Sequence, residues 1–130
     1  MQDHDAAMLA FAKLAGVSQT RKQLGPRDKF LLLTGNAACQ AGWPAVADRC
    51  RELVLANNRA HLIGRFDTYA DALRDSDFGT FLKQLSRFCS YEKAEHLLSQ
   101  LEISPTAPTA SSKMNPGDYA LLLLGHSERR

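Results

Sequence analysis

The stretch from Gly35 to Val54, G-N-A-A-C-Q-A-G-W-P-A-V-A-D-R-C-R-E-L-V, decides the fold of this chain. Small residues recur at helical spacing in its first half, which ends at Gly42, a residue able to take the positive φ that closes a helix. Pro44 can begin the next helix, because the first residue of a helix needs no N–H partner. The stretch therefore predicts a tightly packed helical hairpin whose corner is Gly42, Trp43 and Pro44.

Apolar residues also recur every three or four positions on both sides of this hairpin, and this spacing is typical of the buried face of a helix. Glycines, prolines and short polar residues separate the periodic segments, where they can cap or end helices. Six helices are predicted: from Asp3 or Asp5 to Gly16, from Pro26 to the stop at Gly42, from Pro44 to Asn57 or Asn58, from about Arg59 through Leu73, from the capping cluster at 75–77 through Cys89, and from the cap Ser90 through Leu101.

We therefore expect an all-α fold, a repeat-like bundle of about six helices in antiparallel hairpins, over residues 1–103. Residues 104–117 are rich in Pro, Ser and Thr and are predicted to form a linker. Residues 118–130 form an apolar C-terminal segment and tail, with the dense run Tyr119–Leu124. Leaving this run in water would forfeit about 1.5 to 3 kcal/mol for each buriable leucine, so we expect it to dock.

The length and charge of the chain fit one ordinary globular domain. The chain has 130 residues and a formal net charge of +2, and its basic residues are scattered. Nucleic-acid binders usually concentrate positive charge on one face. A helical domain that binds nucleic acid is therefore the alternative function and not the first one, and it would use Arg21, Lys22, Arg27 and Lys29.

Three cysteines, an acidic start and the absence of a long apolar run indicate a cytoplasmic protein without a membrane span. Cys39, Cys50 and Cys89 lie within periodic segments, and an odd count fits a reducing compartment. Early acids replace the basic start of a secretion signal. No apolar run approaches the roughly 20 residues that a membrane-spanning helix requires.

Motifs of catalysis or cofactor binding are not found in the sequence. His4, His61, His96 and His126 form neither an H-E-x-x-H nor an E-x-x-H pair. There is no G-x-S-x-G and no phosphate-binding glycine loop. We therefore expect a protein that is not an enzyme and that uses no cofactor or metal.

The hairpin resembles a tetratricopeptide-type repeat, a helix-turn-helix unit of about 34 residues. In that family, small residues allow the paired helices to approach closely. The resemblance is carried by Gly35, Asn36, Ala37, Gly42, Ala47 and Val54, and more faintly in the later hairpin by Tyr91, Ala94, Leu101 and Pro105.

The resemblance implies binding of peptides or other proteins, which is what most members of that family do. The chain departs from the family's pattern at Thr34, Pro44 and Arg59. A solenoid fragment and a six-helix bundle that uses the same packing both remain open.

We expect a non-enzymatic interaction or scaffold module that binds a partner peptide or helix in a groove between helices. The apolar C-terminal segment is predicted to occupy such a groove in its own chain or, as a homodimer, in a second copy. The residues expected to bind a partner are Asn36, Trp43, Tyr119, Leu121, Leu122 and Leu124.

Overall fold

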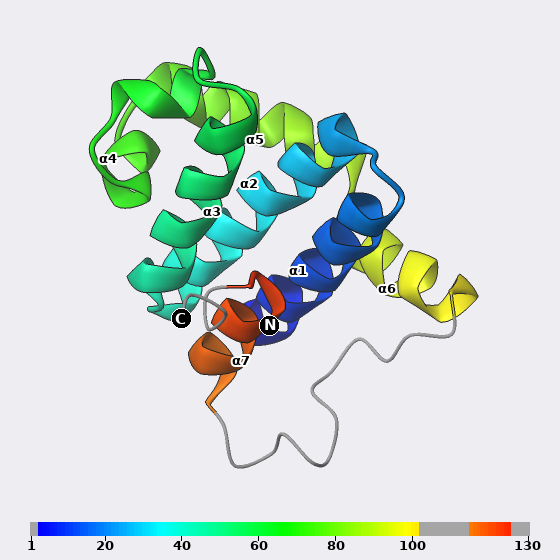
Figure 1. Ribbon diagram of the computed structural model, residues 1–130. Helices are drawn as coiled ribbons and strands as arrows, with labels where there is room; N and C mark the ends of the chain where they lie inside the picture. The colour runs from blue at the N-terminus through cyan, green and yellow to red at the C-terminus, as the bar shows by residue number, and fades with distance from the viewer. Residues whose placement is uncertain (1–2, 102–114, 126–130) are drawn as a thin grey trace.

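The computed structural model describes residues 3–101 and 115–125, and within these ranges it contains helices and no strand (Figure 1). The prediction of an all-α helical bundle is confirmed. The elements are α1 (His4–Thr20), α2 (Leu24–Ala41), α3 (Pro44–Asn57), a 3-10 helix η1 (Leu62–Arg65), α4 (Tyr69–Leu73), α5 (Ser76–Phe88), α6 (Tyr91–Gln100) and α7 (Pro116–Leu123).

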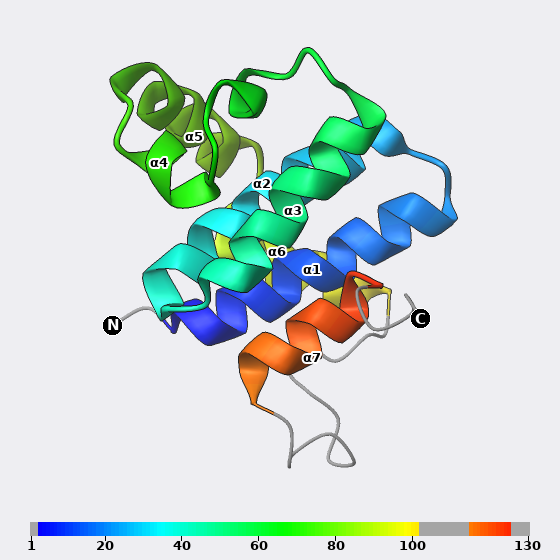
Figure 2. The same cartoon turned by 60° about the vertical axis from the view of Figure 1, so that its left-hand side comes forward.

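Helix α1 lies at the centre of the bundle, flanked by α2, α6 and α7 (Figures 1 and 2). It is buried on all sides in its second and third turns, where every residue from Ala7 to Ala12 is buried. A helix that is apolar all round must be covered all round. Its neighbours therefore meet that requirement from several directions, and α7 supplies one of the covering surfaces.

The corner between α2 and α3 forms as predicted. Gly42 has a φ of 88° and closes α2 in the left-handed region, where its N–H donates to the carbonyls of the last turn. Trp43 is the N-cap residue of α3, and Pro44 is its first residue. Ala47, Cys50 and Val54 are fully buried, as the spacing of α3 predicts.

The predicted caps are also confirmed. The carboxylate of Asp75 accepts a hydrogen bond of 2.9 Å from the N–H of Phe78, at the start of α5. The hydroxyl of Ser90 accepts one of 3.2 Å from Lys93 at the start of α6. Short oxygen-bearing side chains satisfy N–H groups that have no partner inside the helix.

Two helix boundaries differ from the prediction. Helix α1 passes through Gly16 and ends at Thr20, because Ser18 is still buried in the bundle. The chain then turns at Lys22, which has a φ of 60°, so the turn does not use a glycine. Helix α2 begins at Leu24, and this places Pro26 third in its first turn, where no intrahelical N–H bond is lost.

The predicted helix from Arg59 to Leu73 is wrong. The segment forms η1 and the short α4, and Thr68 caps α4 through a 3.1 Å hydrogen bond from the N–H of Asp71. Side chains of α3 bind the backbone between the two pieces. Arg51 Nε donates to the carbonyl of Phe66 at 2.9 Å, and Asp48 Oδ1 accepts from the N–H of Tyr69 at 3.0 Å. These bonds replace those of a continuous helix.

Gly35 is needed because Tyr69 of α4 lies against it. A Cβ at residue 35 would lie 2.8 Å from Cδ2 of the Tyr69 ring, which is too close for any side chain. Tyr69 is fully buried, and its hydroxyl donates to the carbonyl of Leu32. The small residue predicted for a close approach therefore admits an aromatic ring from α4.

The C-terminal segment forms α7. Its first residues, Pro116 and Gly117, fall at the end of the predicted 104–117 linker, and the Asn115 side chain caps the helix by accepting a 2.7 Å hydrogen bond from Asp118. The rest of that linker and the predicted tail beyond Gly125 lie outside the described residues. Helix α7 packs against α1 and α3 of its own chain.

Candidate functional site

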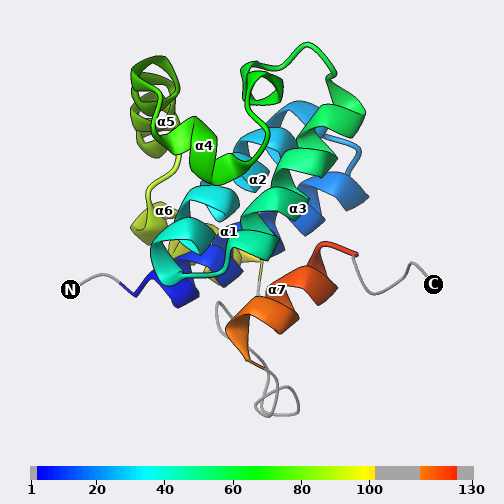
Figure 3. The ribbon, with the colours of Figure 1, turned by 90° about the vertical axis from the view of Figure 1, so that its left-hand side faces the viewer.

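The contact between α7 and the rest of the chain is the most sharply defined docking site in the part of the chain that the structure describes. Figure 3 shows α7 lying along one side of the bundle, next to α1 and α3. Gly117, Tyr119 and Ala120 are buried there. The Tyr119 ring also has the ammonium group of Lys13 above it, 5.7 Å from the ring centroid. We call the surface of α1 and α3 that receives α7 the α7 groove.

Trp43 holds the first turn of α7. Its indole lies against Gly117 so closely that a Cβ at residue 117 would be 2.6 Å from Cδ2 of the ring. No residue other than glycine can take this position without moving the indole or the helix. The backbone of α7 is thus in direct contact with the face of an aromatic ring.

Asp5 fixes the orientation of that indole. Trp43 Nε1 donates a 2.7 Å hydrogen bond to Asp5 Oδ1, in the first turn of α1. A charge-assisted bond of this kind is shorter and stronger than one between neutral groups. Asp5, Trp43 and Gly117 therefore connect α1, the start of α3 and α7 in one line of contacts.

Four of the six residues expected to bind a partner lie in α7 or at its C-terminal end. Tyr119 and Leu124 are buried against their own chain, and Leu121 is partly buried in the core. Leu122 is 44% exposed and is the most exposed large apolar side chain of α7. The structure thus brings Trp43 together with α7, and it places Leu122 on the outer face.

Asn36 lies elsewhere, in a cavity of about 450 Å³ between α1, α2 and the joint of α5 and α6. Gln40, one turn further along α2, lines the same cavity, and Phe11 and Leu33 contribute its apolar wall. The structure therefore separates Asn36 from the other expected residues. It is not part of the α7 groove.

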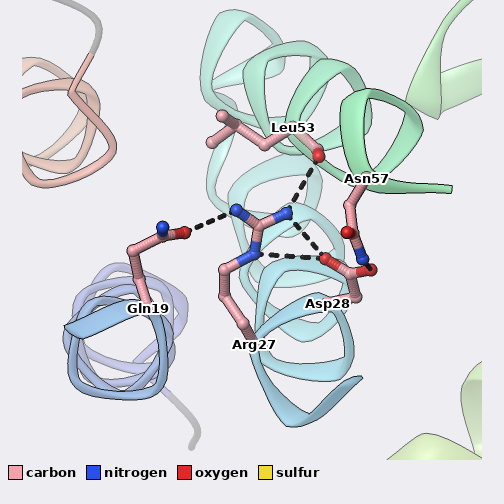
Figure 4. Close-up of polar contacts among 5 residues, drawn as sticks. All are labelled: Gln19, Arg27, Asp28, Leu53 and Asn57. Atoms are coloured by element: carbon pink, nitrogen blue, oxygen red, sulfur yellow. Dashed lines mark hydrogen bonds and ion pairs between the residues drawn. The ribbon is translucent and has the colours of Figure 1, made fainter. Parts of the chain in front are cut away.

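A second set of polar contacts joins the first three helices (Figure 4). Arg27 of α2 binds the carboxylate of Asp28 at 2.8 Å and the side-chain oxygen of Gln19 in α1 at 2.6 Å. It also donates to the carbonyl of Leu53 in α3 at 3.0 Å. Asn57 donates to the other oxygen of Asp28 at 2.8 Å. These contacts hold together the end of α1, the start of α2 and the end of α3.

The titratable groups that the structure shifts are shifted mainly by burial. Burial raises the pKa of the Cys39 thiol to about 11, and the pKa of the fully buried Cys50 thiol is raised further. Burial lowers the pKa of His61, although the charge of Asp28 acts in the opposite direction. All three cysteines are free thiols. Among residues 3–101 and 115–125, no group of three or more His, Cys, Asp or Glu could hold a metal ion.

Sequence reasoning missed Asp5 and Gly117 as contact residues, and it named Arg27 only as a possible contact to nucleic acid and not as the residue that joins α1, α2 and α3. Asp5 looked like a helix-start residue, and Gly117 like part of a linker. Asn115 followed by Pro116 was a usable signal of a helix start, because Asn is favoured at the N-cap and Pro at the first helical position.

No family model matches the chain, no curated protein matches it, and no solved structure matches it. Within the described ranges, no helix is both long enough and apolar enough to cross a membrane.

Proposed function

We propose that this protein is a non-enzymatic interaction module in which the α7 groove binds a short helix of a partner protein. In this structure the groove holds α7 of the same chain. The contact of Trp43 with Gly117 is the main support for the proposal. It requires a glycine at one position of the partner helix, so binding depends on more than the apolar character of that helix.

Helix α7 has the properties of a ligand. It has eight residues, and isolated helices shorter than about 12 to 15 residues are marginal in water. Its helical state therefore depends on the groove and on the cap at Asn115. A partner helix with the same contact residues can compete for the same surface.

The contacts define the kind of helix that fits. It needs glycine where α7 has Gly117, an aromatic residue where Tyr119 meets Lys13, and a small residue where Ala120 is fully buried. An apolar residue at the position of Leu124 completes the pattern G-x-[aromatic]-[small]-x-x-x-[apolar]. A second copy of this chain carries the same pattern, so exchange of α7 between two copies is one form of this binding.

The alternative of nucleic-acid binding has less support. Of the basic residues at the α1–α2 end, Arg27 is bound to Asp28, Gln19 and Leu53. Lys29 lies 4.7 Å from the centroid of the Phe88 ring. Cations engaged in this way have less freedom to contact phosphates. We therefore keep protein binding as the function.

Two further parts of the proposal rest on the sequence and on the thiols. Free cysteines fit a reducing compartment, so we place the protein in the cytoplasm. We also propose that the hairpin of α2 and α3 is related to a tetratricopeptide-type repeat. The left-handed conformation of Gly42 and the close approach of the Tyr69 ring to Gly35 support this.

A helix library tests this function. A chain that ends at residue 114 is used as the receptor, and displayed 11-residue peptides are randomised at the positions of Gly117, Tyr119, Ala120 and Leu124. We expect selection of glycine at the first position, aromatic residues at the second, small residues at the third and apolar residues at the fourth. Circular dichroism first establishes that the shortened receptor is helical and unfolds cooperatively.

The matched control is a receptor of the same length that carries Trp43→Ala. We expect it to lose the preference for glycine while it retains the preference for apolar residues at the last position. A folded wild-type receptor that selects no pattern, or the same pattern from both receptors, would refute the proposal.

A further inference from the structure

A cavity of about 380 Å³ lies between α1, α2, α3 and the end of α7. Arg27 of α2 and Arg49 of α3 both line it, and Gln19 of α1 lines it as well. Its remaining walls are apolar or small, and no Asp or Glu is among the described residues that line it. Two arginine side chains therefore line one open pocket, and the described residues of its wall include no carboxylate.

The partners of Arg27 leave it one N–H group. A guanidinium has five N–H donors. Arg27 uses four of them: two toward Asp28 at 3.2 and 2.8 Å, one toward Gln19 at 2.6 Å and one toward Leu53 at 3.0 Å. One N–H of Nη1 has no acceptor in the described part of the chain. The Arg27 side chain as a whole is 11% exposed.

Arg49 has a buried donor without an acceptor. Its Nε is buried and has no hydrogen-bond partner among residues 3–101 and 115–125. Its Nη1 meets Glu52 at 3.2 Å, but the side chain of Glu52 is 62% exposed and neutralises the guanidinium only weakly. A buried donor of a charged group is costly to leave without an acceptor, and such groups in folded proteins usually have one.

We propose that this cavity is a binding site for an oxyanion, either a carboxylate or a phosphate group. The main donor is the Nε–H of Arg49, and the charge of that guanidinium favours a negative ligand. Arg27 can add only its one remaining Nη1–H, because Asp28 already compensates its charge. The proposal does not rest on helix binding in the α7 groove, because the donors belong to α2 and α3, although Leu123, Leu124 and Gly125 at the end of α7 line one side of the same pocket. The same oxygen chemistry can come from free phosphate or from a carboxylate of another molecule.

Nuclear magnetic resonance of the full chain tests the site, because arginine Nε–H groups give their own signals. Inorganic phosphate, acetate and chloride are titrated separately at constant ionic strength. We expect the Arg49 Nε–H signal to shift and saturate with phosphate, with acetate or with both, and not with chloride. Saturation with phosphate alone identifies a phosphate site, and saturation with acetate alone identifies a carboxylate site. Equal shifts with all three salts, or no shift, would overturn the proposal.

Variants locate the binding to this cavity. Arg49→Gln removes the charge and the buried donor, and we expect binding roughly tenfold weaker or lost. Arg49→Lys keeps the charge but lacks the Nε–H, and we expect the same direction, so either variant serves if the other does not fold. Arg74→Gln is the matched control, because that side chain is 82% exposed. Unchanged affinity in a folded Arg49 variant, or equal loss in Arg74→Gln, would contradict the site.

Discussion

The indole ring of Trp43 lies against the α-carbon of Gly117, so closely that a Cβ on residue 117 would be 2.6 Å from Cδ2. The same indole donates to Asp5 at 2.7 Å. The only tryptophan of the chain therefore joins three segments that are far apart in the sequence. Its fluorescence reports on the docking of α7 directly.

Gly117→Ala tests the contact between Trp43 and α7. Alanine favours a helix over glycine by about 1 kcal/mol, so without the contact the substitution would stabilise α7. We expect the opposite sign, because the added methyl group must displace the indole or the helix. The predicted loss is about 1 to 3 kcal/mol in the free energy of unfolding, with a red shift of Trp43 fluorescence. Urea denaturation followed by fluorescence measures both.

Gly79→Ala is the control for that substitution. Gly79 lies inside α5, and nothing lies within 4 Å of the place where its Cβ would be. We expect this variant to gain up to about 1 kcal/mol and to keep the wild-type emission. Equal effects of the two alanine substitutions would show that Gly117 is not in a restricted position.

Asp5→Ala tests the hydrogen bond that orients the indole. It leaves the Nε1–H of a half-buried Trp43 without its acceptor, and we expect a loss of about 1 to 3 kcal/mol in the free energy of unfolding. Asp5→Asn keeps an acceptor oxygen and removes only the charge, so we expect a smaller loss. If both variants lose the same amount, the charge of Asp5 at the start of α1 is responsible, and not the bond to Trp43.

We expect protonation of His61 to lower the stability of the folded chain as the pH falls. Its Nδ1 accepts a 3.0 Å hydrogen bond from the N–H of Ile63, and burial lowers its pKa. The unfolded chain therefore binds a proton at a higher pH than the folded chain does. The contribution of His61 is present above about pH 6.5 and is lost as the pH falls through the lower pKa of the folded state.

The measurement is urea denaturation between pH 7.5 and pH 5. His61→Asn is the matched variant, because asparagine can cap the turn without titrating. We expect its stability to fall less than that of the wild type over this range. Parallel curves for the two proteins would assign the pH dependence to other groups.

Because burial raises the pKa values of the thiols, we expect them to react slowly with a thiol reagent, at a rate that depends steeply on pH. With its pKa raised to about 11, Cys39 has on the order of one thiolate in a thousand molecules at pH 8. We expect an aromatic disulfide reagent to label native Cys39 first, at a rate that rises about tenfold per pH unit up to pH 10. Cys50 and Cys89 are buried and should react only after unfolding. Cys39→Ser should remove the labelling that occurs before unfolding, and native-state labelling that remains in this variant would contradict the assignment.

The same thiols also affect stability at high pH. Their pKa values are higher in the folded chain than in the unfolded chain, so the unfolded chain loses protons first as the pH rises. Their contribution to stability is present below about pH 8.5 and is lost as the pH rises above it. We expect the free energy of unfolding to fall between pH 9 and pH 10.5, and to fall less in Cys39→Ser.

Local rules in the sequence were sufficient for the corner and for the caps. Gly42 and Pro44 act on their own backbone, and Asp75 and Ser90 act within one helical turn. The pattern of apolar residues between Arg59 and Leu73 was misleading, because it gives the same spacing whether or not the backbone is continuous. Arg51 and Asp48 of α3 decide that backbone, and neither is local to it.

The α7 groove was likewise predictable from the sequence only in part. The apolar run of Tyr119–Leu124 predicted that the segment must be covered, and it left open whether its own chain or a second copy does so. The partner of Trp43 could not be predicted, because Asp5 is 38 residues away and no periodic pattern connects the two. Gly117 had a local explanation as a loop residue, so its contact with the indole appears only in three dimensions.

The central claim is that the α7 groove recognises a helix through Trp43. Its most direct test is a titration of a peptide of residues 115–125 into the chain that ends at residue 114, followed by Trp43 fluorescence. We predict a saturable blue shift with the wild-type peptide and binding at least tenfold weaker with the peptide that carries Gly117→Ala. No saturable change with a folded receptor, or equal affinity for the two peptides, would contradict the account.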